Sequence, residues 1–268
     1  MAKFNRLIGK HIVVLGGSGG IGRAIVEAAI ESGARLTLVG SSQKTADAAV
    51  SSVKAEYPKA QLVGLGCDLS QPTIEQDLDA LLTRAAQPSG EIDHIILTAG
   101  ERVPYVGLQD ITSDDVFKAA HMRFLVPLMV GKVAQRHLTG ATNGMPGDGK
   151  NKSLTFTSGT IATKPIPNFA IGTYVAAGLN GMMRNLALDL SPIRVNAVEP
   201  GPVNTPLWDA AFAGSGTSRD DGLQKMFSRL PVGKAATTEE VAEAYMYLLR
   251  DTNATGEVVK TGGGSHLI

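Results

Sequence analysis

Short apolar runs alternate with amphipathic segments along most of this 268-residue chain. The first run, residues 11–15, is continuously apolar after its histidine, which is typical of a strand buried on both faces. The next segment, residues 21–32, repeats its apolar positions with helical spacing and ends at Gly33. Further strands are predicted at 35–39, 62–65, 94–98, 154–157, 194–198 and 257–260. Further helices are predicted at 45–56, 74–84, 116–138, 174–190 and 237–249, with Thr112–Asp115 and Thr237–Glu240 as capping sequences.

Strands that alternate with helices indicate βαβ units. The predicted fold class is α/β, a doubly wound (Rossmann) parallel sheet with helices on both faces, as one domain over residues 1–268. Residues 140–152 form a polar loop in this prediction. Residues 208–223 combine glycines with mixed charge, and they are either a lid over a pocket or a plain surface excursion.

Composition narrows the class of protein. Lysine plus arginine equals aspartate plus glutamate, 25 each, which gives no electrostatic case for nucleic acid or an anionic membrane as partner. Cys67 is the single cysteine, so no internal disulfide is expected and a reducing compartment is favoured. The amino terminus is too polar for a signal peptide, and no apolar run reaches transmembrane length. We expect a cytoplasmic protein without a metal site.

Five glycines crowd the stretch Val13–Gly22, directly after the first predicted strand. They fit the dinucleotide pattern G-x-G-x-x-G (Gly17, Gly19, Gly22), the looser G-x-x-x-G-x-G (Gly16, Gly20, Gly22), and the hydrolase elbow G-x-S-x-G around Ser18. The elbow needs a later strand with Asp and His following in order, and a plain turn rarely needs so many glycines. A strand, a glycine loop and a helix at the start of the chain favour a pyrophosphate cradle.

Four motifs occur in order along the chain and carry a resemblance. They are Gly16-x-x-x-Gly20-Ile21-Gly22, Cys67-Asp68-Leu69, Thr98-Ala99-Gly100, and the run from Arg194 to Gly201 followed by Thr205. Together they resemble the classical short-chain dehydrogenase/reductase family over nearly the whole chain, although Leu15 replaces the family's usual threonine.

The resemblance implies a set of cofactor-binding residues. Asp68 would contact the adenine, residues 98–100 would line the cofactor, and Val203 with Thr205 would hold the nicotinamide carboxamide. The full set implied by the motifs is Gly16, Ser18, Gly19, Gly20, Ile21, Gly22, Asp68, Leu69, Thr98, Ala99, Gly100, Pro200, Gly201, Val203 and Thr205.

The end of the second strand bears on the choice of nicotinamide cofactor. A residue that binds the ribose 2′-OH of NAD would be acidic and would stand about twenty positions beyond the glycines. Residues 39–44 contain no carboxylate, whereas Ser41, Ser42 and Lys44 can bind a 2′-phosphate. This composition predicts NADP(H). The other interpretation is a solvated turn that selects neither cofactor.

The tyrosine and lysine that carry proton transfer in that family are missing. Counting back from Arg194-Val195-Asn196 places Gly172 at the tyrosine position and Ala176 at the lysine position. Tyr174 is followed four residues later by Gly178, and it lies two helical steps, about 200°, from the Gly172 face. Neither register therefore yields a Tyr/Lys pair.

Two other family positions give the predicted catalytic residues. Arg123 stands at the position of the family's asparagine, on an apolar helix face where an arginine needs an ion-pair partner or a ligand. The serine position falls on Gly159, next to Ser158, although strand-end serines commonly bond the local backbone. Arg123 and Ser158 are predicted to act in catalysis. The weaker candidates for a proton donor are Glu101, His121 and Asn168.

These departures resemble a divergent set of bacterial and fungal short-chain reductases that lack Tyr-x-x-x-Lys. Its fungal members include NADPH-dependent reductases of alkaloid pathways, some of which also guide a Diels–Alder cyclisation with an Arg and an Asp. The Asp position here is Ser158. The resemblance implies an NADP(H)-dependent reductase of atypical mechanism that acts on an activated carbonyl, imine or iminium of a small organic substrate.

Two alternatives remain open at the level of sequence. One is a non-redox protein that keeps the cofactor as a structural or sensing ligand, and the other is a cyclase that uses its pocket for orientation. The helices at 119–138 and 174–190 are rich in small and apolar residues on more than one face. With the family's four-helix interface as a guide, they predict a homodimer or homotetramer.

Overall fold

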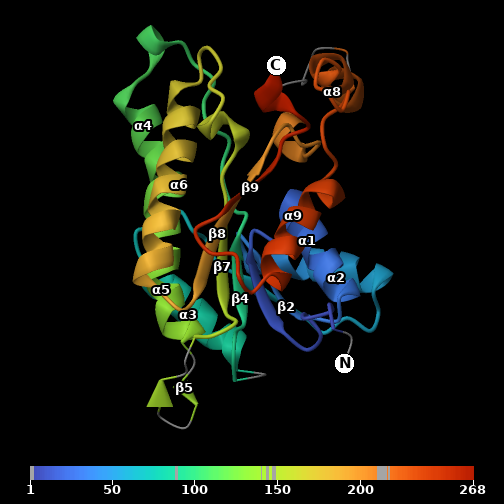
Figure 1. Cartoon of the computed structure of the whole chain (residues 1–268), viewed down its shortest axis with the longest axis vertical. Coiled ribbons are helices and arrows are strands. Elements are labelled where there is room, and N and C mark those ends of the chain that lie inside the picture. The colour runs from blue at the N-terminus through green and yellow to red at the C-terminus, as the bar shows by residue number, and fades with distance from the viewer. Residues whose placement is uncertain are drawn as a thin grey trace.

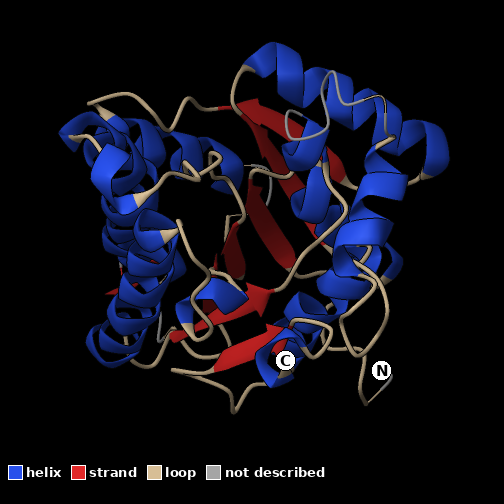
Figure 2. Cartoon of the chain, turned by 90° about the horizontal axis from the view of Figure 1, so that it is seen from above, coloured by secondary structure: helices blue, strands red, loops and turns tan. Residues whose placement is uncertain are grey.

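A sheet of seven parallel strands runs between two groups of helices, as the view in Figure 2 shows. The computed structural model describes residues 3–87, 90–139, 141–142, 145–146, 149–209, 216 and 218–268. In this part of the chain the strand order is β3-β2-β1-β4-β7-β8-β9. The strands are β1 (His11–Leu15), β2 (Arg35–Gly40), β3 (Leu62–Gly66), β4 (His94–Leu97), β7 (Ser153–Thr157), β8 (Arg194–Pro200) and β9 (Val258–Thr261).

Each face of the sheet carries its own layer of helices (Figure 1). One layer contains α1 (Gly20–Glu31), α2 (Gln43–Glu56) and α9 (Thr238–Arg250), and the other contains α3 (Ile74–Ala86), α5 (Val126–Leu138) and α6 (Ala170–Asp189). In β1, Ile12 and Val14 pack into the first layer, whereas Val13 and Leu15 pack into the second. This alternation explains why the strand is apolar at every position. The predicted doubly wound fold is confirmed.

The prediction of one continuous helix over residues 116–138 is wrong. The structure has α4 (Ser113–Ala120), a π-helical segment η2 (His121–Leu125) and then α5. Val126 N–H donates to His121 O, a bond five residues back along the chain. The cause lies in Pro127, which has no N–H to give the carbonyl of Arg123 and whose ring would crowd that carbonyl. The wide turn therefore falls on Arg123, and such π segments often mark functional sites.

Other boundaries shift by a few residues. Helix α6 begins at Ala170, four residues before the predicted start, so that residues 172 and 174 both lie in its first turns. The predicted capping boxes are confirmed, since Thr112 pairs with Asp115 and Thr237 pairs with Glu240. No described helix combines the length and apolar character needed to cross a membrane.

The two segments predicted as loops are only partly described. Between residues 140 and 152 the strands β5 (Ala141–Thr142) and β6 (Met145–Pro146) pair antiparallel. Between 208 and 223 the structure describes the end of a 3₁₀ turn (Pro206–Trp208) and the start of α8 (Arg219–Phe227), which lies at the top of Figure 1. Residues 210–215 and 217 lie outside the described residues, so the lid interpretation remains a prediction.

Candidate functional site

The glycine loop joins β1 to α1 at the carboxyl edge of the sheet, where ligands of open α/β sheets bind. Three of its glycines have no room for a side chain or need an unusual backbone. Gly16 has φ +93°, and a Cβ there would lie 2.5 Å from Ala99 N. A Cβ on Gly22 would lie 2.1 Å from Gly16 O. Gly20 has φ +53°, in the left-handed region that favours glycine.

This geometry decides among the patterns that the sequence left open. Gly19 is extended, and a Cβ on it would meet nothing within 4 Å. The constrained set is therefore Gly16, Gly20 and Gly22, the G-x-x-x-G-x-G spacing. Ser18 is not among the non-glycine residues with positive φ, whereas a nucleophile elbow holds its serine on a strained turn. The elbow interpretation is not supported.

The loop also provides groups that bind phosphate. No side chain caps α1 at Gly19, and no acidic residue lies in its first turn. The first N–H groups of α1 lack partners within the helix, and they point to the carboxyl edge together with the positive end of the helix dipole. These residues fit the pyrophosphate of a dinucleotide.

The other predicted cofactor segments meet at the same place. Thr98 Oγ1 donates to Leu15 O, 3.2 Å away, and a Cβ on Gly22 would lie 2.6 Å from that hydroxyl. Thr205 lies against the loop, because a Cβ on Gly20 would be 3.5 Å from Thr205 Cγ2. The tertiary structure thus gathers residues 16–22, 98–100 and 205 at one edge.

Val203 carries a contact that sequence reasoning missed. Its carbonyl accepts a hydrogen bond of 3.0 Å from Nε1 of Trp208, the chain's single tryptophan. Pro200 and Gly201 lie beside it, and Gly201 leaves no space for a Cβ, which would be 2.7 Å from Gly262 Cα. The predicted carboxamide site is therefore coupled to the 3₁₀ turn that follows it.

The residues predicted to select NADP lie exposed at the end of β2 and the start of α2. Ser42 caps α2, since its hydroxyl accepts from Thr45 N–H at 3.2 Å. Ser41 and Lys44 make no hydrogen bond or ion pair within the described residues and are available to a ligand. The first turn of α2 contains no acidic residue, so nothing in it repels a phosphate.

Asp68 and Leu69 follow β3 at the same edge. Ser70 and Gln71 hold the Asp68 carboxylate, with hydrogen bonds of 2.7 Å from Ser70 Oγ and 2.6 Å from Gln71 Nε2, and these bonds lower the pKa of Asp68. Leu69 is buried, and its carbonyl bonds Nε2 of His121 at 3.2 Å. His121 is thus tied to the backbone of the predicted adenine site.

Arg123 points from η2 onto the end of β4. A Cβ on Gly100 would lie 2.7 Å from its Cζ and Nη1, so the guanidinium rests directly against the glycine. Its Nη2 donates to Glu101 O at 2.7 Å. Burial lowers the pKa of Arg123, and attraction to Glu101 partly offsets that effect. Within the described residues no carboxylate lies within ion-pair distance, so the structural ion pair considered for Arg123 is not seen there.

The faces of α6 and β7 hold the residues predicted at the family's proton-relay positions. Gly172 and Ala176, predicted at the tyrosine and lysine positions, are buried. A Cβ on Gly172 would lie 2.2 Å from Phe169 Cε1, so the Phe169 ring covers the place where a tyrosine would emerge. Ser158 Oγ donates a hydrogen bond to Ala176 O at 3.1 Å, so this oxygen can act toward a ligand only as a hydrogen-bond acceptor.

Tyr174 lies on a different face of α6. Its side chain is 63% exposed, and its ring meets that of Phe124 edge-on with the centroids 5.0 Å apart. The predicted separation of Tyr174 from the 172/176 face agrees with this geometry. Of the weaker candidates, Glu101 and Asn168 are exposed and His121 is engaged at Leu69.

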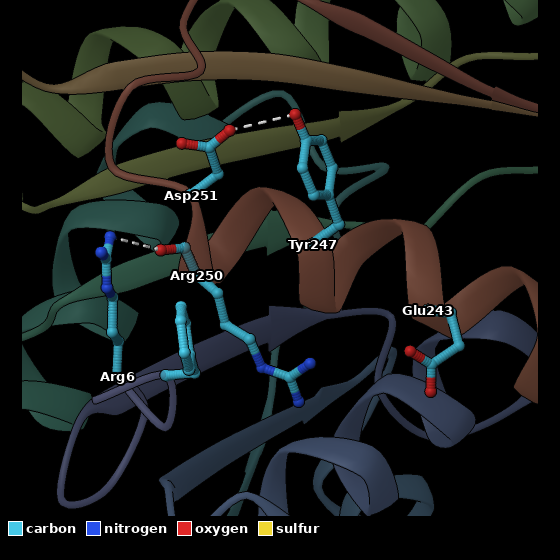
Figure 3. Close-up of a pocket in the computed structure, with 6 residues that line it drawn as sticks. Arg6, Glu243, Tyr247, Arg250 and Asp251 are labelled. Atoms are coloured by element: carbon cyan, nitrogen blue, oxygen red, sulfur yellow. Dashed lines mark hydrogen bonds between the residues drawn. The ribbon is translucent and has the colours of Figure 1, made fainter. Parts of the chain in front are cut away.

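A separate hollow lies between the amino-terminal segment and α9, lined by Phe4, Arg6, Glu243, Tyr247, Arg250 and Asp251 (Figure 3). Arg6 donates to Arg250 O at 3.1 Å, and the Tyr247 hydroxyl donates to Asp251 at 3.0 Å. This end of α9 is beside the first residue of β8, because Arg194 donates to Leu248 O at 2.9 Å. The hollow is therefore near the amino ends of the strands, away from the glycine loop.

The fold and the carboxyl-edge site define a Rossmann-like scaffold with a phosphate-binding loop, and comparison with known proteins identifies its family. The model of the SDR-like Rossmann domain matches residues 3–268. The chain belongs to the short-chain dehydrogenase/reductase family.

Its relatives include fungal proteins of the same length. The short-chain dehydrogenase/reductase fsr5 of Gibberella fujikuroi is 34% identical over 267 residues, covering 98% of this chain and 97% of that protein. ATR9 of Stachybotrys chlorohalonatus is 35% identical over 260 residues, covering 97% and 98%. The structure of the reductase/Diels-Alderase MalC from Malbranchea aurantiaca aligns with a TM-score of 0.85 at 34% identity, covering 98% of both chains.

Proposed function

We propose that this protein is an NADP(H)-dependent reductase that works without the Tyr/Lys relay and acts on an activated carbonyl, imine or iminium of a small organic molecule. The observation that carries the mechanism is the Phe169 ring over Gly172, next to Ala176, where the family's tyrosine and lysine would stand. The similarity to fungal reductases, MalC among them, supports a substrate from secondary metabolism.

The described residues suggest how such a site would act. The first N–H groups of α1 would hold the pyrophosphate, and Ser41 with Lys44 would hold the 2′-phosphate. When bound, NADPH supplies a hydride. Arg123 would bind and orient the substrate, and Ser158 could accept a hydrogen bond from it. No tyrosine donates a proton in this scheme, so the substrate must be one that is already activated.

A cyclase or a non-redox cofactor-binding protein is the competing function. The MalC similarity and the missing relay favour the cyclase among these two, because orientation of a substrate needs no proton donor. Consumption of NADPH with a candidate substrate separates a reductase from both.

Calorimetry tests the cofactor preference. We expect NADPH to bind at least ten-fold more tightly than NADH, a difference of about 1.4 kcal/mol that one or two charge-assisted hydrogen bonds can supply. Lys44→Ala should remove most of this preference, since the ammonium would no longer meet the phosphate. Lys54→Ala, at the other end of the same helix, is the matched control and should leave both affinities unchanged. Equal affinities in the wild type would show that this turn does not read the 2′ position.

We also propose a cytoplasmic homodimer or homotetramer. The apolar side chains of Phe117, Tyr174 and Leu188 on α4 and α6 are 72%, 63% and 78% exposed. A second copy of the chain could cover these apolar side chains.

A further inference from the structure

Arg123 carries a charge that the described protein does not neutralise. Its one hydrogen bond goes to a neutral carbonyl, Glu101 O. Its Nε is buried without a partner, and Nη1 has no hydrogen-bond partner among the described residues. A guanidinium has five N–H donors in a planar fork, and removing it from water without a counter-ion is costly. The protein therefore retains a half-buried cation with donors to spare at the carboxyl edge of the sheet.

No acidic group among the described residues at this edge forms an ion pair with Arg123, although the Glu101 carboxylate attracts it electrostatically. Asp209 pairs with Arg219 at 2.8 Å, and the buried Glu199 accepts a hydrogen bond from Asn180. The Glu101 carboxylate is exposed to solvent and does not form an ion pair with Arg123. Residues 210–215, which lie outside the described part, contain no acidic side chain in the sequence. A counter-ion for Arg123 is thus left to a ligand.

An aromatic surface occupies the same edge. The Phe169 ring covers Gly172 and lies 5.9 Å from the ring of Tyr105, centroid to centroid. Tyr105 belongs to the loop that starts at Gly100 and Glu101, the two residues that Arg123 contacts. A ligand at this edge would therefore meet a cation and aromatic faces, which suits an acid with an apolar or aromatic body.

We infer that the substrate class is an oxo acid, a carbonyl compound whose carboxylate binds the Arg123 guanidinium while its apolar part packs on Phe169 and Tyr105. A planar carboxylate matches the guanidinium fork, and the pair is charge-assisted. The inference rests on the proposed reductase function and narrows its substrate. A cationic iminium without a carboxylate of its own would be repelled by the unpaired arginine.

The reaction that follows is balanced by the proposed cofactor. The carbonyl carbon accepts a hydride from NADPH as the C=O π bond opens, and the oxygen takes a proton from water. The products are a hydroxy acid, NADP⁺ and a hydroxide ion, which passes to the solvent. The proton can come from water because no described side chain at the Gly172/Ala176 face carries one.

Binding experiments test the carboxylate site independently of turnover. The probes are benzoylformate, phenylpyruvate and levulinate, each compared with its own primary amide, titrated into the NADP⁺-saturated protein by calorimetry. We expect at least one acid to bind ten-fold or more tightly than its amide. Arg123→Leu should abolish that preference, and Arg102→Ala, at a neighbouring exposed arginine, should retain it. A thermal melt and the NADP⁺ affinity of each variant confirm that the fold persists.

The outcomes separate the two proposals. If no acid is preferred to its amide, or if the preference survives in Arg123→Leu, the carboxylate site is refuted. If Arg123→Leu loses its fold, Arg123→Gln replaces it, with the same loss of preference expected. NADPH oxidation with the bound acid is followed separately. An acid that binds through Arg123 without oxidising NADPH would support the site and contradict the reductase.

Discussion

Phe169 lies beside Gly172, the residue predicted to stand at the position of the family's tyrosine. The Phe169 ring occupies the space that a Cβ on Gly172 would need, so a tyrosine at residue 172 would collide with the ring. Asn168, just before it, has φ +59°, a conformation that asparagine tolerates better than most residues. A tyrosine at residue 172 would therefore require a change at Phe169 as well.

Two of the three glycines of α6, at positions 172 and 181, offer a direct test of this packing. Gly172→Ala should lower the free energy of unfolding by about 1–3 kcal/mol, because its Cβ has no space beside the Phe169 ring. Gly181→Ala should raise it by about 0.5–1 kcal/mol, since a Cβ there meets nothing within 4 Å and alanine favours the helix. Urea denaturation measures both, and equal stabilisation of the two variants would contradict the placement of Phe169.

At the scale of elements, the helix between residues 113 and 138 carries the largest departure from prediction. Apolar residues recur with one helical spacing throughout this region of the sequence. The capping box of Thr112 and Asp115 at its amino-terminal end can also be recognised in the sequence. Pro127 interrupts the bonding that the period implies and opens the π turn at His121–Leu125. That turn aims Arg123 at Gly100. Pro127, four residues after Arg123, was the sequence signal for this turn.

The loop between β1 and α1 yields a prediction about its glycines. Gly22→Ala should destabilise the protein by more than about 2 kcal/mol, because the new Cβ would overlap the Gly16 carbonyl at 2.1 Å. Gly19→Ala should cost less than about 1 kcal/mol, since Gly19 is an extended N-cap residue with open space around it. Thermal melts of the two purified variants provide the comparison. A larger loss in Gly19→Ala would restore the G-x-G-x-x-G assignment.

For the whole molecule, polar groups at the amino ends of the strands make stability sensitive to acid. Burial opposes ionisation of Asp93, but bonds from His11 N–H and from the ammonium groups of Lys10 and Lys152 outweigh it and lower its pKa to about 2. Burial lowers the pKa of His94 to about 3. At both groups the unfolded chain binds more protons than the folded chain once pH falls below the ordinary pKa values, 6.5 for histidine and 3.8 for aspartate. Stability is therefore full at neutral pH and is lost as pH falls through these ranges.

Asp93→Asn tests the aspartate's share of this effect. The variant should lose about 2 kcal/mol of unfolding free energy at neutral pH, and its deficit should shrink as pH falls from 3.8 towards 2. Asp114→Asn, on the exposed first turn of α4, is the control and should change stability by about 0.5 kcal/mol or less. Urea titrations across pH provide the measurement, and a deficit that stays constant with pH would contradict the assigned pKa.

The oligomeric state is a second prediction for the whole molecule. If the apolar face of α4 and α6 is an interface, light scattering at micromolar concentration should give the mass of a dimer or tetramer. Leu188→Glu, at the most exposed of these side chains, should shift the mass towards the 28.0 kDa monomer. The control is Val63→Glu, which changes an exposed apolar residue on the edge strand β3, away from α4 and α6, and should leave the mass unchanged. A monomeric wild type would exclude the interface.

The sequence by itself determined the doubly wound fold and the two capping boxes, whereas the strand order came from the structure. These depend on local spacing: continuous apolar runs fit strands buried on both faces, and cap residues bond within three positions. It also predicted Gly172, Ala176 and Arg123 at the family's catalytic positions by counting from neighbouring motifs, and this assignment stays a prediction.

Only the tertiary structure decided which glycines are obligatory, that Phe169 covers Gly172, and that Arg123 lies against Gly100 without a carboxylate. The contacts of Gly16 with Ala99 and of Arg123 with Gly100 join segments that are distant along the chain, whereas Phe169 reaches Gly172 from the N-cap of the same helix. Gly16 meets Ala99 only because β1 and β4 are neighbours in the sheet. The hydrogen bond from Thr98 to Leu15, directly beside this contact, joins residues that are 83 positions apart along the chain. Periodicity reports which face of an element is apolar, but the distance between two faces is set by the packing of the whole sheet.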